Sequence, residues 1–213
     1  MTKKEKVKKI IPIMEKKFGN PKCELNYTTA FELLIAVILS AQCTDARVNI
    51  VTEKMFEIMN TPLEFSEASL SQIEKMIYST GFYKNKSKNI QLTSKILVSE
   101  YNSEVPQDME KLTNLAGVGR KTANVVRGEI FGLADGVTVD THVKRITNLM
   151  GLVKSENPIK IEKELMKIIP KKYWIVFSHY MVLHGRSTCV ARRPQCSECE
   201  VLEWCNFGIN KLK

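Results

Sequence analysis

The chain has 213 residues, of which 44% are hydrophobic and 26% are charged, as expected for one large globular domain or two small ones. Its formal net charge of +9 favours a polyanionic partner, nucleic acid before an anionic membrane, over lysines that only solvate the surface. The longest apolar run, Phe31 to Ala41, contains Glu32 and is too short to cross a bilayer. The basic N-terminus lacks the long apolar stretch of a signal peptide, so we expect a cytoplasmic protein.

The spacing of apolar residues predicts helices along most of the chain, because these residues recur three and four positions apart. A buried core helix is expected to begin at Phe31, and Gly185 is expected to end the last long apolar helix. The segment GVTVDTHV, residues 136–143, could form a strand, but no second strand pairs with it. The sequence therefore predicts an all-α fold of about ten short helices. The helical spacing covers residues 1–19, 31–59, 69–81, 86–101, 108–114, 122 onward, 158–169 and 173–185.

A glycine-rich stretch, LAGVG at residues 115–119, is expected to form a tight turn between two helices and is followed by Arg120, Lys121 and Thr122. Backbone N–H groups at such a turn, entering a helix N-terminus, make a site for an anion. A nucleotide-binding P-loop is excluded, because it needs glycine directly before Lys-Thr and a preceding strand, and Arg120 occupies that place. Two interpretations stay open: a structural turn without a ligand, and a helix-hairpin-helix element that grips a DNA backbone.

Four of the six cysteines lie within the last 25 residues with the spacing C-x6-C-x2-C-x5-C: Cys189, Cys196, Cys199 and Cys205. Such a group predicts one compact metal centre. Zinc sites usually present two C-x2-C pairs or a mixture of cysteine and histidine, whereas an iron–sulfur cubane takes four thiolates from loops of this kind. The spacing favours the cluster over zinc. Arg192 and Arg193 lie in the first loop, where they can meet a phosphate backbone.

Four segments in order, covering about residues 24–205, together resemble the endonuclease III family of helix-hairpin-helix DNA glycosylases: ELNYTTAFELLIAVILSAQCTD, LAGVGRKTANVV, VTVDTHVKRI and LHGRSTCVARRPQCSECEVLEWC. The resemblance implies two helical domains flanking a DNA-binding cleft. One is a six-helix domain, residues 23–134, that carries the hairpin. The other combines residues 1–22 and 135–213 and holds a 4Fe–4S cluster on Cys189, Cys196, Cys199 and Cys205.

The same resemblance implies an enzyme of base-excision repair. It would remove oxidised pyrimidines, such as thymine glycol, from double-stranded DNA and cut the strand at the resulting abasic site. Its partner would be damaged or abasic DNA, with no membrane involved. The protein is then expected to be a monomer, associated with the nucleoid through DNA.

Family motifs also imply individual roles. Lys121 matches the nucleophile that forms a Schiff base, and Asp140 matches the catalytic aspartate, although an aspartate before threonine is ordinarily a helix N-cap. Gln42 and Phe82 match two residues that enter the duplex when the target base leaves the stack, with phenylalanine where leucine is usual. Asp45 matches an acidic residue of the lesion pocket. The remaining expected DNA contacts are Gly117, Val118, Gly119, Arg120, His142, Arg192 and Arg193.

Three other functions are considered against this one. Monofunctional glycosylases of the same superfamily typically lack lysine at position 121. A DNA-binding module without enzymatic activity would need the hairpin, but would have no use for Lys121 together with Asp140. A regulator that binds zinc through the cysteines would be colourless, unlike an iron–sulfur protein.

Overall fold

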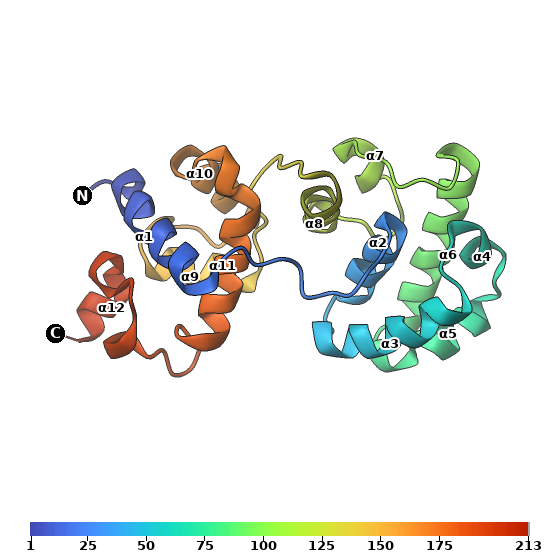
Figure 1. Ribbon diagram of the computed structural model, residues 1–213, viewed down its shortest axis with the longest axis horizontal. Helices are drawn as coiled ribbons and strands as arrows, with labels where there is room; N and C mark the ends of the chain where they lie inside the picture. The colour runs from blue at the N-terminus through green and yellow to red at the C-terminus, as the bar shows by residue number, and fades with distance from the viewer. Residues whose placement is uncertain (213) are drawn as a thin grey trace. The chain divides into compact units, whose positions relative to one another are not determined.

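A computed structural model describes residues 1–212 of the chain. These residues form twelve α-helices and four short 3-10 helices and contain no strand, which confirms the predicted all-α class (Figure 1). The chain divides into two compact units. One unit contains residues 24–133, and the other joins residues 1–23 to the chain from residue 134 onward.

The unit of residues 24–133 is built around α2, of which nine of the ten residues are buried. Helices α3, α6 and α8 pack against it. This burial explains why the run from Phe31 is apolar on every side. The elements of the unit are α2 (Ala30–Leu39), α3 (Asp45–Ile58), α4 (Pro62–Glu67), α5 (Leu70–Ile77), η1 (Tyr78–Thr80), α6 (Tyr83–Glu100), α7 (Met109–Thr113) and α8 (Arg120–Phe131).

Glu32 is the single charge in this apolar helix and is buried. Its carboxylate accepts hydrogen bonds from the backbone N–H of Thr28 at 2.5 Å and from the Thr28 hydroxyl at 2.7 Å. The Thr29 N–H donates to the same carboxylate at 3.3 Å, and the Thr29 hydroxyl accepts from the Glu32 N–H at 3.1 Å. This capping box pairs the buried acid with backbone donors at the start of α2, so the charge does not disturb the core.

The second unit joins the N-terminal helix to the C-terminal half of the chain. Figure 1 shows α1 beside α11, and the two helices are in contact. The Tyr180 hydroxyl donates to the Gly19 carbonyl at 3.1 Å, and the Lys6 ammonium donates to the Met150 carbonyl at 3.2 Å. The elements are α1 (Lys3–Phe18), α9 (Thr141–Leu149), α10 (Pro158–Ile168), η2 (Lys171–Tyr173), α11 (Trp174–Ser187), η3 (Cys196–Glu198), η4 (Leu202–Trp204) and α12 (Asn206–Lys211).

The predicted end of α11 at Gly185 is wrong, because the helix continues to Ser187. Gly185 is buried where α11 meets α9. A Cβ atom at this position would lie 3.0 Å from the Ile146 side chain and would also press on the His142 ring. The glycine is therefore required by close packing between two helices rather than by a turn.

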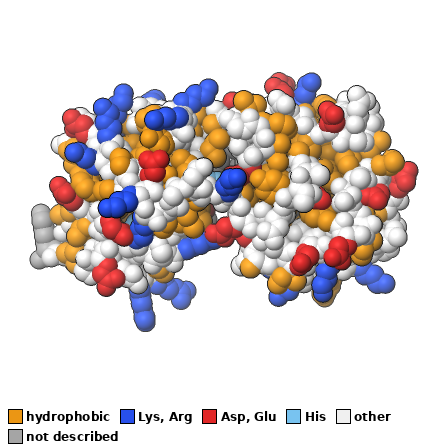
Figure 2. Space-filling view, viewed as in Figure 1, with side chains coloured by type: hydrophobic (Ala, Val, Ile, Leu, Met, Phe, Trp, Pro, Cys, Tyr) orange, Lys and Arg blue, Asp and Glu red, His pale blue; other side chains and the backbone are white. Residues whose placement is uncertain are grey.

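No helix within residues 1–212 combines the length and the hydrophobicity needed to cross a lipid bilayer. On the face shown in Figure 2, lysine and arginine side chains lie on both units and are interspersed with acidic ones. The positive net charge of the chain is thus not gathered into a single patch on this face.

Candidate functional site

The LAGVG turn connects α7 to α8 as predicted, but α8 begins at Arg120 rather than Thr122. Gly119 is its N-cap, with φ −86° and ψ 173°. Lys121 consequently lies in the first turn of the helix, where it is exposed. No side chain caps α8, so the N–H groups of this turn form a positive end that can receive an anion.

The two glycines of the turn differ in what they do. Gly117 has φ +76°, and a Cβ atom there would lie 2.8 Å from the amide nitrogen of Asn89 on α6. Gly119 has an ordinary backbone conformation, and a Cβ atom there would meet nothing within 4 Å. Val118 between them is buried, and its N–H donates to the Leu115 carbonyl at 3.1 Å. Gly117 and Val118 therefore shape the turn, whereas Gly119 keeps its outer surface open.

Asp140 is the N-cap of α9 and is half-buried in its unit. One carboxylate oxygen accepts a hydrogen bond from the Val143 N–H at 2.7 Å, so the capping role considered from the sequence is present in the structure. The cap uses one oxygen and leaves the second as a proton acceptor. Lys121 and Asp140 belong to different units.

Gln42 and Phe82 share an uncommon backbone conformation. Their φ angles are +55° and +49°, in the left-handed region that residues other than glycine rarely adopt and that clusters at functional sites. Gln42 follows the end of α2, and Phe82 follows η1. The Phe82 side chain is 65% exposed, which excludes a role in the core and leaves its ring available to stack on a base.

The other predicted contacts lie at helix ends or in loops. Asp45 is the first residue of α3, where a carboxylate also interacts favourably with the helix dipole. His142 is half-buried near the start of α9. Arg192 and Arg193 are exposed in the loop that follows Cys189.

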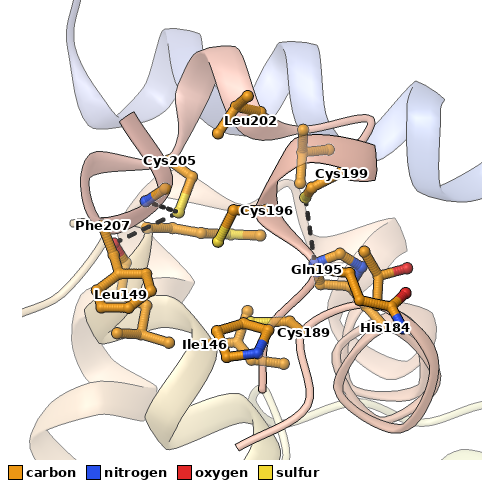
Figure 3. A pocket seen from close by; sticks show the side chains of 15 residues that line it. Ile146, Leu149, His184, Cys189, Gln195, Cys196, Cys199, Leu202, Cys205 and Phe207 are labelled. Carbon is orange, nitrogen blue, oxygen red and sulfur yellow. Dashed lines mark hydrogen bonds between the residues drawn. The ribbon is translucent and has the colours of Figure 1, made fainter. Parts of the chain in front are cut away.

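The four C-terminal cysteines are brought together around one cavity (Figure 3). All four thiols are free and half-buried. The rest of the lining is mainly apolar and includes Ile146, Leu149, Val201, Leu202 and Phe207.

Local structure fixes where each thiol lies. Cys189 follows α11, Cys196 begins η3, and Cys199 directly follows its end. Cys205 caps α12 by accepting from the Gly208 N–H at 3.4 Å. This irregular segment brings thiols that are as many as 16 positions apart in the sequence to one cavity.

Arg145 ties α9 to this segment, a contact that the sequence did not predict. Its guanidinium donates to the Cys189 carbonyl at 2.7 Å and lies 3.7 Å from the Cys189 sulfur. The Cys205 thiol donates to the Leu149 carbonyl at 3.7 Å. The helix that Asp140 caps therefore rests on the cysteine segment.

Burial changes the pKa values of several side chains that line the cavity. It raises the pKa of the Cys199 thiol to about 11, and it also raises the pKa of Cys189, against the opposing effect of Arg145. Burial lowers the pKa of His184 to about 4, and its ring lies 3.9 Å from the Cys199 sulfur. At neutral pH the Cys189 and Cys199 thiols and the His184 ring are therefore uncharged, and binding of a metal replaces thiol protons.

The arrangement fits a cluster better than a single ion. Within residues 1–212, no three cysteine, histidine or acidic side chains converge closely enough to hold one metal ion. A zinc ion needs its four ligands at about 2.0–2.3 Å, whereas an iron–sulfur cubane is a larger body held by four thiolates. Four thiols that line one cavity from separate positions in a loop match the second case.

Comparison with known proteins identifies the family. Residues 35–171 match the HhH-GPD superfamily of base excision DNA repair proteins, and residues 189–205 match the iron–sulfur binding domain of endonuclease III. The chain is 47% identical to endonuclease III of Synechocystis sp. over 96% of this chain and 93% of that protein. The chain belongs to the endonuclease III family. Endonuclease III of Escherichia coli is 41% identical over 88% of this chain and 89% of that protein.

Solved structures of endonuclease III agree with this assignment. A trapped covalent intermediate of endonuclease III with DNA is 43% identical, with a TM-score of 0.93 over 100% of both chains. A non-covalent endonuclease III–DNA complex is 44% identical, also with a TM-score of 0.93, over 100% of this chain and 99% of that chain. A thermostable thymine-DNA glycosylase shares the fold at 18% identity and a TM-score of 0.85.

As a member of the endonuclease III family, the chain is a DNA glycosylase and abasic-site lyase of base-excision repair. Its iron–sulfur binding domain implies a 4Fe–4S cluster. The predicted family, enzyme class and cofactor are confirmed. The zinc-binding regulator and the non-enzymatic DNA-binding module are both wrong.

Proposed function

We propose that the protein removes oxidised pyrimidines, such as thymine glycol, from double-stranded DNA and cleaves the abasic site by β-elimination. The observation that carries this proposal is the position of Lys121. It is exposed in the first turn of α8, directly after a turn whose N–H groups can hold a phosphate. Because the backbone supplies that anion site, the Lys121 amine is available for chemistry.

Lys121 is the proposed nucleophile. Its neutral amine attacks C1′ of the damaged nucleotide, the bond from C1′ to the base breaks, and the base leaves with the bonding electrons and takes up a proton. The ring oxygen then leaves C1′ and takes up the remaining proton of the amine, and an imine forms. Loss of a C2′ proton then expels the 3′ phosphate, and hydrolysis of the imine restores the lysine.

Asp140 is the proposed base. The amine must be neutral when it attacks, so a base must first take its proton. The N-cap bond from Val143 at 2.7 Å holds the Asp140 carboxylate in one orientation. Its second oxygen can accept the proton or stabilise positive charge that develops on the sugar.

Binding of damaged DNA by the protein is proposed to use the hairpin and two turns. Gly119 and the first turn of α8, with the Arg120 side chain, hold a phosphate. Gln42 and Phe82 fill the space that the target nucleotide leaves. Further contacts come from Gly117, Val118, His142, Arg192 and Arg193, and Asp45 lines the lesion pocket. The protein acts as a monomer.

The proposed ligands of the 4Fe–4S cluster are Cys189, Cys196, Cys199 and Cys205. When bound, a cluster would be held by these four thiolates and would cross-link the segment against which α9 packs. The cysteine segment thus supports α9, the helix that begins after Asp140, through the bond from Arg145 to Cys189.

Borohydride trapping tests the proposal. The protein is incubated with a duplex that contains thymine glycol or an abasic site, and the imine is reduced to a stable bond. We expect a covalent protein–DNA complex with the wild type and none with Lys121→Gln. Trapping that persists in Lys121→Gln would assign the nucleophile to another residue.

A further inference from the structure

Lys86 is a buried lysine in the unit of residues 24–133, with 5% of its surface exposed. Lysine is seldom buried unless its charge has partners. Here the ammonium donates to the Leu39 carbonyl at 2.8 Å and to the Thr80 carbonyl at 2.8 Å. Burial lowers the pKa of Lys86, and the nearby Cys43 thiol acts in the opposite direction. Both acceptors are neutral carbonyls, so the position of the side chain is set by backbone geometry.

The two acceptors are equivalent in kind. Leu39 is the last residue of α2, and Thr80 is the last residue of η1. Carbonyls at a helix C-terminus lack partners within the helix and form its negative end, where a cation is stabilised. A single ammonium therefore donates to the C-terminal carbonyls of two helices whose ends are separated by about forty residues in the sequence.

Each of these helix ends leads directly into a turn with a left-handed residue. Gln42 follows Leu39 by three positions, and Phe82 follows Thr80 by two. The backbone N–H of Lys86 also donates to the Phe82 carbonyl at 3.1 Å. Lys86 thus binds the Phe82 turn on both sides, through its backbone and its side chain, and the same side chain binds the start of the Gln42 turn.

We propose that Lys86 is a positioning residue that sets the spacing between Gln42 and Phe82 by joining the Leu39 and Thr80 carbonyls. The proposal rests on the proposed function, in which these two side chains enter the duplex. Without the bridge, the helix ends separate and the two turns lose their fixed relation. Functional groups need placement to within about 0.5 Å, so the loss would appear in extrusion of the base before any chemical step.

If Lys86 has this role, the effect of its loss on the rate of excision depends on whether the lesion is paired. Extruding a paired and stacked base costs more than extruding one that has no partner. A defect in the two inserting side chains therefore slows excision of a paired lesion most. General destabilisation of the unit, in contrast, would slow excision of paired and unpaired lesions equally.

The experiment compares single-turnover excision of thymine glycol opposite adenine with excision of the same lesion opposite an abasic-site analogue. Lys86→Met keeps the length of the side chain and removes its donors, and Lys86→Arg keeps donors. Gln91→Met is the matched control, because Gln91 on the same helix α6 donates to the Ala68 carbonyl at 2.7 Å. Thermal melting of each variant fixes an assay temperature at which all are folded.

For Lys86→Met, we expect the rate with the paired lesion to fall about tenfold, as for loss of hydrogen bonds to a charged group, while the rate with the unpaired lesion falls less than about threefold. Lys86→Arg is expected to recover most of the paired rate, and Gln91→Met should leave the ratio of the two rates unchanged. An unchanged ratio in Lys86→Met, or an equal fall in Gln91→Met, overturns the proposal. If Lys86→Met does not fold, Lys86→Leu, which also lacks donors, is measured and the same two outcomes apply.

Two direct variants separate this proposal from the function on which it rests. Gln42→Ala and Phe82→Ala should each lower the ratio of paired to unpaired excision. If they lower it and Lys86→Met does not, only the positioning role of Lys86 fails. If neither lowers it, the insertion of Gln42 and Phe82 is wrong, and the role of Lys86 fails with it, while trapping through Lys121 stands or falls independently.

Discussion

Gly117→Ala and Gly119→Ala have different expected effects, on stability and on DNA affinity respectively, although the two glycines are two positions apart in one turn. At Gly117 the positive φ of 76° costs an alanine about 1–2 kcal/mol. Its Cβ would also lie 2.8 Å from the amide nitrogen of Asn89 and 2.9 Å from the Asn89 Cβ, and overpacking of this kind costs about 1–3 kcal/mol. The free energy of unfolding should therefore fall by about 2–5 kcal/mol.

At Gly119 the backbone conformation suits any residue, and an added methyl group meets nothing within 4 Å. The change from glycine to alanine at an N-cap costs only about 1 kcal/mol or less. The methyl group would instead stand on the surface where a phosphate approaches the α8 N-terminus. We expect affinity for DNA to fall about tenfold, as for loss of one charged hydrogen bond.

Two assays on the same variants test this pair of expectations. Urea unfolding gives the midpoint of each variant, and fluorescence anisotropy with a duplex that contains an abasic-site analogue gives its affinity at a fixed salt concentration. Gly117→Ala should lose stability, and Gly119→Ala should lose affinity while its midpoint stays close to that of the wild type. Equal loss of stability in both variants, or full affinity in Gly119→Ala, would refute the separation of roles.

Three further predictions follow from the same geometry. Asp140→Asn should keep the N-cap, because asparagine accepts the Val143 hydrogen bond as well as aspartate does. Excision should nevertheless slow about a hundredfold or more. An equal loss of DNA affinity, measured by anisotropy, would indicate that Asp140 has a structural role only. The purified protein should absorb visible light at about 400 nm and contain about four irons per chain. Cys199→Ser should lower both the absorbance and the iron content. Bound zinc with no iron would contradict the assignment of the four cysteines to an iron–sulfur cluster. Burial lowers the pKa of Lys86 below its usual value of 10.5, so the unfolded chain keeps this proton to higher pH than the folded chain does. The wild type should therefore gain stability relative to Lys86→Met as pH rises from neutrality toward 10.5, with Cys43 present in both proteins; urea unfolding of the two at both ends of that range measures the difference, and a constant difference would contradict it.

Local signals in the sequence were sufficient for much of the fold. The helix α10 begins at Pro158 as predicted, after an asparagine cap, and Ser69 caps α5, because capping depends on residues within one turn. The cysteine spacing likewise predicted one shared centre, and the four thiols line one cavity.

Long-range packing set what the sequence could not predict. Gly185 was taken for a helix end because glycine often ends helices, whereas its position is required by contact with α9. For the segment that contains Lys86 the sequence predicts only a helix. It does not show the acceptor Leu39, which lies 47 positions away along the chain. The left-handed backbone of Gln42 and Phe82 also has no signal in the sequence, because neither residue is a glycine.

The central claim is that the Lys121 amine forms the covalent bond to the sugar. Its most direct test is proteolysis of the borohydride-trapped complex followed by mass spectrometry of the peptide that carries the DNA remnant. The account predicts that the modification maps to Lys121 in the first turn of α8. A modification on any other lysine, with Lys121 unmodified in the same complex, would contradict it.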